Sequence, residues 1–392
     1  PDSGGNVGQH TDIVAPDAST VYISYYDVTN GNLKFAKSVN GGSSFTTVTV
    51  DSSANDVGQY SSISATSTGG NIFISYYDAT FGDLKIARST DGGTVWSISS
   101  VDSTGDVGKY SSLDTVHSQA TTTVYISYYD DTSDNLKFAR STQFVFPTFT
   151  VSTVDSTGDM GQFSSIAAVN DTTVDNGQTV YISYYDADSN DLKLAASTNS
   201  GSSFSLSTAV SSGDVGQHSS IAIVDPTTIF ISYFEDAPID ANNKLRTVRS
   251  TDSGATFEDP ATVDEGQTVG QYNDISLVGT TNVFVSYWDD NPGSGFGNLK
   301  FAKSTALIDL IGHRVTLDWS MDPTDSSNTS LYDGRILQIS QLNRTEWLFK
   351  IPPTAKPGPS IEQTQIRIVI RAPGTMDPGF YTATFELRQI DG

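Results

Sequence analysis

The chain repeats a seven-residue segment that is apolar or aromatic on both of its alternating faces. The first copy covers residues 21–27, and five more cover residues 72–78, 124–130, 180–186, 229–235 and 283–289. A strand with one wet face alternates apolar and polar residues, whereas a strand covered on both faces is apolar throughout. We therefore predict six strands that each lie between two neighbouring layers.

Three further strand-like segments accompany each copy in a constant order. A motif of Val-Gly-Gln followed by Tyr, Phe or His opens each unit, with Lys109 replacing Gln in the third unit and Met160 replacing Val in the fourth. The motif starts at residues 7, 57, 107, 160, 215 and 269, so successive units are 50 to 55 residues apart. Four short strands in a unit of this length are typical of a β-propeller blade. The sequence predicts an all-β protein with a six-bladed β-propeller at residues 1–310.

The sixth unit has no recognisable fourth strand after its third strand, which ends near Ser304. A propeller usually completes its last blade with a strand from the other terminus. Here that strand could come from residues before Pro1, from residues 307–310 onward, or from another subunit, and the sequence leaves all three open. Because no signal peptide is present and Pro1 falls within a repeat, we expect Pro1 to be a processed or trimmed end.

The repeat stops near Ile311, and the composition changes with it. Five strand-like segments follow, at residues 314–321, 334–342, 345–351, 363–372 and 380–389, with Pro and Gly between them. The fourth and fifth alternate between polar and apolar residues, which indicates one wet and one buried face. We predict a small immunoglobulin-like β-sandwich at residues 311–392.

The net charge narrows the classes of partner. The chain carries 45 acidic and 21 basic residues, for a formal charge of −24, and it contains no cysteine. Such a surface repels nucleic acid and anionic lipid, so we expect neither as a partner. The absence of cysteine excludes disulfides and thiolate chemistry, and no apolar run is long enough for membrane insertion.

The turn between the third and fourth strands resembles the Asp box of bacterial-neuraminidase-type repeats, S-x-D-x-G-x-x-W/F. Residues 89–96 and 250–257 fit that pattern, residues 38–45 and 197–204 carry Asn in place of Asp, and residues 141–149 fit it poorly. The box position is held by Asn40, Asp91, Asn199 and Asp252. The resemblance implies a sialidase-like propeller in which the box is a structural turn away from the active face.

The resemblance also implies what a sialidase would need: three arginines for the substrate carboxylate, a Tyr–Glu pair and an acidic proton donor. The propeller contains only Arg88, Arg140, Arg246 and Arg249, and all four fall at repeated third-strand positions. Most acidic residues are repeated as well, whereas a glycosidase uses one distinct pair of carboxylates. We therefore expect no enzymatic activity and no catalytic residues.

One face of the predicted propeller collects repeated polar and aromatic residues. The loops before the first strands bring Asp56, Asp106, Asp159 and Asp214, and the first strands bring His10, Tyr60, Tyr110, Phe163, His218 and Tyr272. Aromatic rings flanked by carboxylates suit a carbohydrate or cation ligand. The alternative is structural: aromatics packed between blades, and acids at the end of the second strand, such as Asp27, paired with third-strand lysines such as Lys34.

Two loops contain oxygen ligands at alternate positions, as loops that bind hard cations do. Their ligands would be Asp130, Asp134, Asp186, Asp188 and Asn190. Neither loop has the bidentate Glu that completes an EF-hand, which weakens the signal for Ca²⁺. Ca²⁺ is nevertheless the only cofactor that the sequence suggests.

The leading hypothesis is a non-catalytic extracellular protein of a cell or virion surface: an adhesin, a spike, or a subunit of a surface filament or layer. The propeller would be the exposed head and the C-terminal domain the mount. Self-assembly, or binding to another surface protein, would use the C-terminal domain or the incomplete sixth blade. A glycan-binding, lectin-like propeller is the alternative, and a divergent glycosidase ranks third.

Overall fold

The computed structural model describes two compact units, Pro1–Lys303 and Ser304–Gly392. In the first unit it describes residues 2–303 except 54–55, 67–69, 119–120, 143–147, 172–176, 238–241, 268, 280–281 and 291–296. In the second it describes residues 304, 314–319, 338–343, 346–350 and 366–371. Among the described residues, no helix is long and apolar enough to cross a membrane.

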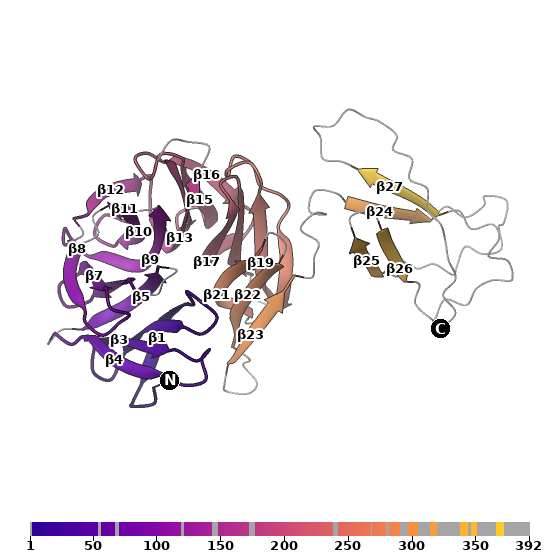
Figure 1. Cartoon of the computed structure of the whole chain (residues 1–392). Coiled ribbons are helices and arrows are strands. Elements are labelled where there is room, and N and C mark those ends of the chain that lie inside the picture. Colours follow the sequence, from indigo (N-terminus) through magenta and orange to yellow (C-terminus); the bar gives the residue numbers. More distant parts are fainter. Residues whose placement is uncertain are drawn as a thin grey trace, which may run out of the picture. The chain divides into compact units, whose positions relative to one another are not determined.

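The first unit is a six-bladed β-propeller, as the repeat predicted (Figure 1). Each blade is an antiparallel sheet whose strands pair in chain order. The first three blades are β1 (Val7–Val14), β2 (Val21–Asp27), β3 (Asn32–Ser38), β4 (Thr46–Asp51); β5 (Val57–Ala65), β6 (Ile72–Asp78), β7 (Asp83–Ser89), β8 (Ser97–Asp102); and β9 (Val107–Ser118), β10 (Thr121–Asp130), β11 (Asn135–Ser141), β12 (Thr150–Asp155). The last three are β13 (Met160–Asp171), β14 (Gly177–Asp186), β15 (Asp191–Ser197), β16 (Ser205–Val210); β17 (Asp214–Asp225), β18 (Thr228–Asp236), β19 (Asn243–Ser250), β20 (Ala261–Gly266); and β21 (Val269–Val278), β22 (Asn282–Asp289), β23 (Asn298–Lys303).

The second strand of each blade supplies most of the core. Every residue of β6 is buried, and β2 and β18 are buried over most of their length. Tyr76, Tyr128 and Tyr184 lie at the same place in successive blades and are fully enclosed. The prediction that these strands lie between neighbouring blades is confirmed.

A buried aspartate ties each of these tyrosines to the preceding blade. Asp51, at the end of β4, accepts hydrogen bonds from the Tyr76 hydroxyl at 2.8 Å and from Lys85 at 3.0 Å in the next blade. Asp102, Asp155 and Asp264 stand in the same place at later junctions. The lysines also pair within their own hairpins, as Lys85 does with Asp78 at 3.5 Å, so the predicted pairing across the hairpin is present as well.

In the first blade, Asp2 takes the part that Asp51 plays in the second. Its carboxylate accepts a hydrogen bond from the Tyr25 hydroxyl at 2.8 Å and pairs with Lys34. The polar cluster of blade 1 is therefore satisfied without a fourth strand in blade 6.

The described residues of the second unit form two antiparallel strand pairs. The first joins β24 (Arg314–Trp319) to β27 (Ile366–Arg371), and the second joins β25 (Gln338–Asn343) to β26 (Glu346–Lys350). These strands overlap four of the five predicted segments, and β25 runs one residue past the segment at 334–342. The fifth segment, residues 380–389, lies outside the described residues, so the immunoglobulin-like sandwich and the boundary at residue 310 stay predictions.

Candidate functional site

Six aromatic side chains line one pocket on the innermost strands of the propeller. The pocket has a volume of about 200 Å³. Its aromatic residues are His10, Tyr60, Tyr110, Phe163, His218 and Tyr272, one from each blade, and we call them the aromatic ring. These are the six aromatic residues that the sequence assigned to one face.

A β-bulge places each member of the aromatic ring. In blade 1, Gln9 pairs with Tyr26 and Asp12 with Ser24, so three steps along β1 match two along β2. The extra residue, His10, has a φ of 50°, and the other five ring members have φ between 48° and 52°. A left-handed backbone costs a non-glycine residue roughly 1–2 kcal/mol, and strain of this kind concentrates at functional sites. Its repetition in all six blades makes the ring the candidate site.

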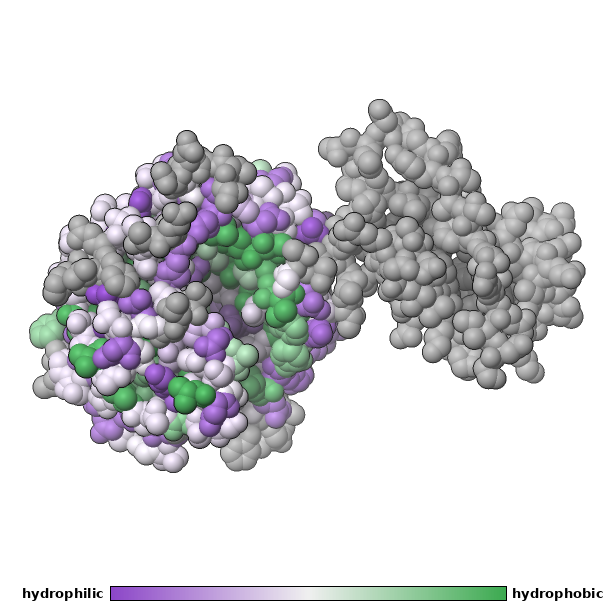
Figure 2. Space-filling model, viewed as in Figure 1, coloured by the Kyte–Doolittle hydropathy of each residue, from purple (hydrophilic) through white to green (hydrophobic). Residues whose placement is uncertain are grey.

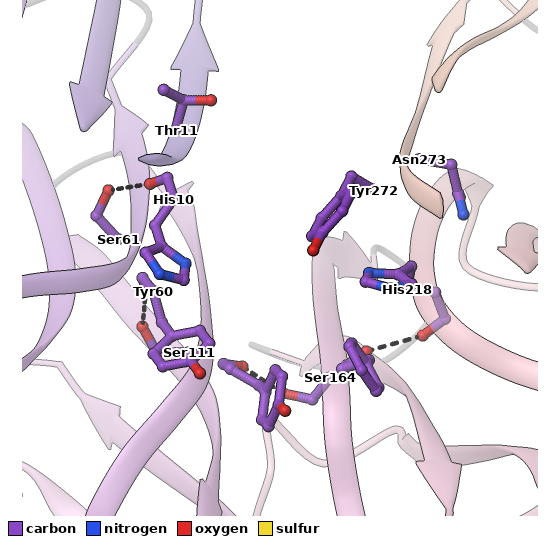
Figure 3. Close-up of a pocket in the computed structure, with 12 residues that line it drawn as sticks. His10, Thr11, Tyr60, Ser61, Ser111, Ser164, His218, Tyr272 and Asn273 are labelled. Atoms are coloured by element: carbon purple, nitrogen blue, oxygen red, sulfur yellow. Dashed lines mark hydrogen bonds between the residues drawn. The ribbon is translucent and has the colours of Figure 1, made fainter. Parts of the chain in front are cut away.

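Serine hydroxyls hold the bulges in place from the neighbouring blade. The Ser61 hydroxyl donates to the His10 carbonyl oxygen at 2.7 Å, and Ser111 donates to the Tyr60 carbonyl at 2.7 Å (Figure 3). Ser164 and Ser219 repeat this bond in the next two blades. Four of the ring's backbone positions are thus fixed by a polar link between blades.

The ring members also touch one another around the axis. Ring centroids lie 4.4 Å apart for His10 and Tyr60, 4.9 Å for Tyr60 and Tyr110, and 4.7 Å for Tyr110 and Phe163. His218 lies 4.4 Å from both Phe163 and Tyr272. Tyr272 and His10 are the two exposed members, and Figure 3 shows an open space between them.

The predicted acids of this face support the aromatic residues around the ring. Asp106 accepts a hydrogen bond from the Tyr77 hydroxyl at 2.6 Å, and Asp159 accepts one from Tyr129 at 2.8 Å. Asp56 and Asp214 accept the corresponding bonds from Tyr26 and Tyr185. None of the four acids is among the residues that line the pocket. Their carboxylates position a surrounding layer of tyrosines and are not aimed at the ring.

Lys109 breaks the six-fold pattern next to the ring. It stands where the other five blades carry Gln, at positions 9, 59, 162, 217 and 271, and it pairs with Asp106 at 3.0 Å and Asp131 at 2.7 Å. Burial lowers the pKa of Lys109, but its hydrogen bonds to Asp131 and Asp106 outweigh that effect and raise the pKa above its usual range. The positive charge of Lys109 is therefore neutralised by these two carboxylates.

The two histidines act as neutral aromatic rings near pH 7. Burial lowers the pKa of His218 to about 4 and also lowers that of His10. With neutral imidazoles, the ring presents aromatic faces and hydroxyls without a formal charge. Such a surface suits stacking against an uncharged, partly apolar ligand.

The residues suggested for Ca²⁺ serve turn geometry. Asp130 and Asp186 accept hydrogen bonds from backbone amides of the turns that follow them. The other three accept from different groups: Asp134 from the Tyr129 hydroxyl, Asn190 from the Tyr185 hydroxyl and Asp188 from the Asp159 amide. Within the described ranges, no group of three or more His, Asp or Glu side chains is placed to hold a metal ion. The calcium site stays a prediction.

The residues at the Asp-box position cap their turns. Asp91 accepts hydrogen bonds from the Ser89 hydroxyl and from the Thr94 and Val95 amides, and Asp252 accepts from the Ser250 hydroxyl and the Thr256 amide. Asn40 and Asn199 accept the same bonds through their side-chain oxygens. In the third unit, residues 143–147 lie outside the described residues.

The arginines of the propeller lie away from the aromatic ring. Arg246 pairs with Glu235 at 2.7 Å, and Arg249 lies over the Phe230 ring and 3.7 Å from Glu258. Arg88 lies over the Phe73 ring. No arginine is among the described residues that line the pocket.

Sequence reasoning missed the polar residues beneath the ring. The pocket is also lined by Thr11, Ser61, Ser111, Ser164, Ser219 and Asn273. Their signal was available, because Ser-Ser follows the aromatic residue in four of the six repeats. It was overlooked because serines in a serine-rich chain are not conspicuous.

Known structures resemble the propeller in fold. The intramolecular trans-sialidase from Ruminococcus gnavus, solved with oseltamivir carboxylate, is 12% identical with a TM-score of 0.52, over 78% of this chain and 96% of that one. A leech intramolecular trans-sialidase is 14% identical with a TM-score of 0.52, over 79% and 69%. The NanB sialidase from Streptococcus pneumoniae is 9% identical with a TM-score of 0.50, over 76% and 68%.

Comparison with models of protein families gives no match, and comparison with curated proteins gives none either. At identities this low, the structural likeness shows the fold alone. The chain has a sialidase-like six-bladed β-propeller fold.

Proposed function

We propose that this protein is a non-catalytic, glycan-binding propeller displayed on a cell or virion surface, with the aromatic ring as its ligand site. The observation that carries the proposal is the ring itself: six aromatic side chains, each in a left-handed bulge, around one pocket. Sugars present apolar C–H faces that stack on aromatic rings, and the hydroxyls of Tyr60, Tyr110 and Tyr272 can hydrogen-bond to sugar hydroxyls.

The charges around the site support binding without catalysis. Glycosidic cleavage uses two carboxylates set several ångströms apart across the bond. The acids predicted for this face, Asp56, Asp106, Asp159 and Asp214, are engaged by tyrosine hydroxyls, and no acid or arginine is among the described residues that line the pocket. These engagements favour a lectin over a glycosidase.

The site is tested by a glycan array probed with the intact protein. Asn adopts the left-handed backbone more readily than most residues, so Tyr60→Asn and Tyr110→Asn remove an aromatic face while sparing the bulge. We expect each variant to weaken glycan binding about fivefold, because stacking of a sugar on an aromatic ring contributes on the order of 1 kcal/mol per ring. Phe81→Asn, in an exposed turn, is the matched control and should bind as the unaltered protein does.

Two results would overturn the proposal. One is an array on which the unaltered protein retains no glycan, or on which both ring variants bind as well as the control. The other is turnover of a fluorogenic sialoside that is lost on substituting a single acid, which would make the protein a glycosidase. Surface display is tested separately by protease shaving of intact cells or particles.

A further inference from the structure

Five of the six junctions between adjacent blades are packed by the same pair of residues. At the first, Gly58 of blade 2 lies against Leu33 of blade 1, so that a Cβ on Gly58 would stand 2.7 Å from the Leu33 Cα. The same approach recurs for Gly108, Gly161, Gly216 and Gly270 against the third strands of the preceding blades. The glycine at the start of each first strand is therefore what lets the next blade seat closely.

The sixth junction, between blades 6 and 1, has the same residues held apart. Gly8 has a similar positive φ, at +97°, yet no atom of the described residues lies within 4 Å of a Cβ built on it. Its expected partner, Leu299 on β23, is 80% exposed, whereas Leu33 at the first junction is fully buried. Phe301 is 65% exposed, against 1% for its counterpart Phe35.

Hydrogen bonds from a backbone amide of one blade to a side chain of the preceding blade run around the axis, and they are interrupted at the sixth junction. Asp12 of blade 1 accepts the Ile63 amide of blade 2 at 2.8 Å, and Ser62 accepts the Leu113 amide of blade 3. The residue in blade 6 equivalent to Asp12 is Asp274, whose target by symmetry is the Ile13 amide. That amide donates to Asp12 in its own strand, at 2.7 Å.

Side-chain burial also shows that the sixth junction is open. Ile13 is 57% exposed, whereas its counterparts Ile63, Leu113, Ile166, Ile221 and Ile275 are 4–6% exposed. The space-filling view shows a hollow in the propeller unit with hydrophobic surface along it (Figure 2). Apolar surface of this kind is normally covered, and the other five junctions show what covers it: the adjacent blade.

We infer that the junction between blades 6 and 1 is a seam that closes, with Leu299 and Phe301 docking on the Gly8 face of blade 1 and Asp274 taking the Ile13 amide. Closure brings Tyr272 up to His10 and completes the aromatic ring. Because Asp2 already satisfies Tyr25 and Lys34, closure leaves that polar cluster of blade 1 paired. The further claim that glycan binding depends on closure rests on the proposed function.

The absence of cysteine from the sequence allows a direct test. A double variant, Asp12→Cys with Asp274→Cys, carries the only two thiols of the chain, one on each side of the seam. The calibration pair is Asp12→Cys with Ser62→Cys, across a formed junction where the Ser62 hydroxyl donates to Asp12 at 2.9 Å. We expect both pairs to oxidise to intramolecular disulfides at rates within tenfold of each other, measured by mass spectrometry. A calibration pair that oxidises while the seam pair stays reduced overturns the inference.

A second variant decides the question without cysteine. In an open seam the side chain at position 299 is exposed, so Leu299→Arg leaves the free energy of unfolding unchanged. In a closed seam the same substitution buries a charge and lowers that free energy. We expect Leu299→Arg to lower the melting temperature and raise amide exchange in β1 and β23, while Phe81→Arg, at a turn residue that is 66% exposed, changes neither. Identical behaviour of the two variants would show that the seam does not close.

Glycan binding separates the two proposals. If binding depends on closure, Leu299→Arg weakens retention on the array at least tenfold, although Leu299 does not line the pocket. Undiminished binding by Leu299→Arg would overturn the coupling and leave the ring as the site. If the unaltered protein binds no glycan, the proposed function fails, while the disulfide and melting experiments still decide whether the seam closes.

Discussion

Gly58 and Leu33 meet across the junction of blades 1 and 2 with no room for a side chain on the glycine: a Cβ there would lie 2.7 Å from the Leu33 Cα. Gly8 has a comparable backbone and open space around it. The two glycines therefore separate backbone strain from packing between blades.

We expect Gly58→Ala to destabilise the propeller by roughly 2–5 kcal/mol, the sum of left-handed strain and overpacking. Because the inferred seam closes on Gly8, Gly8→Ala should cost a comparable amount, whereas a loss of only about 1–2 kcal/mol would mean that the seam stays open. Chemical denaturation of both variants measures the difference. Equal losses would mean that the sixth junction is packed as tightly as the first.

The buried Asp51 should be among the most sensitive polar positions of the fold. Asp51→Ala removes the hydrogen-bond acceptor of Tyr76 and the closer of the two acidic partners of Lys85. Removing one partner of a buried pair costs roughly 3–5 kcal/mol. We expect a loss of that order in denaturant unfolding, and a smaller loss for Asp51→Asn, which keeps an oxygen for the Tyr76 hydroxyl. An Asp51→Ala variant as stable as the unaltered protein would contradict this account.

The stability of the propeller should fall on mild acidification, in part because of His218. Burial lowers the pKa of His218 to about 4, below the unfolded value of about 6.5. The unfolded chain therefore binds the proton first, so this contribution is complete above pH 6.5 and is lost as pH falls toward 4.

Phe163 occupies the equivalent position with a φ of 52°, against 51° for His218, so His218→Phe fits the bulge. We expect this variant to lose roughly 2–3 kcal/mol less stability than the unaltered protein between pH 7 and pH 4. Urea unfolding at both pH values measures it. Parallel pH profiles would show that His218 is not the titrating group.

The Asp-box turns predict that an amide can replace the acid. Asp252 accepts the Ser250 hydroxyl and the Thr256 amide, and Asn199 accepts the matching pair of bonds in another blade. Asp252→Asn should leave the melting temperature unchanged, whereas Asp252→Ala should lower it because two donors lose their acceptor. The prediction fails if Asn is as damaging as Ala.

The sequence was a good guide to the blades because their information is local. Seven consecutive residues of each second strand are enough to predict that both faces of the strand are buried. Asp78 pairs across a hairpin with Lys85, which is only seven positions later. The aromatic ring could be assigned to one face, since repeats place equivalent residues at equivalent heights.

The sequence did not reveal what happens between blades. The Tyr76 hydroxyl donates a hydrogen bond to Asp51, which lies 25 residues earlier in another repeat, and no local pattern marks that pair. The positive φ of Tyr60 could not be expected either, because aromatic residues seldom adopt it and only the surrounding strand pairing enforces it. The gap beside Gly8 is a relation between the first and last repeats, which no single repeat encodes.

The shared aspartates have a consequence for how such a chain can be divided. Four repeats contribute the acid that the tyrosine and lysine of their successor need, so such a repeat cut out alone would carry an acid without its partners. Folding units of this kind overlap along the chain and do not coincide with the 50-residue period. Swapping blades between related propellers should therefore succeed when the exchange boundary falls just before the aspartate, so that the acid moves with its tyrosine and lysine, and fail when it falls after the aspartate, at the visible end of the repeat.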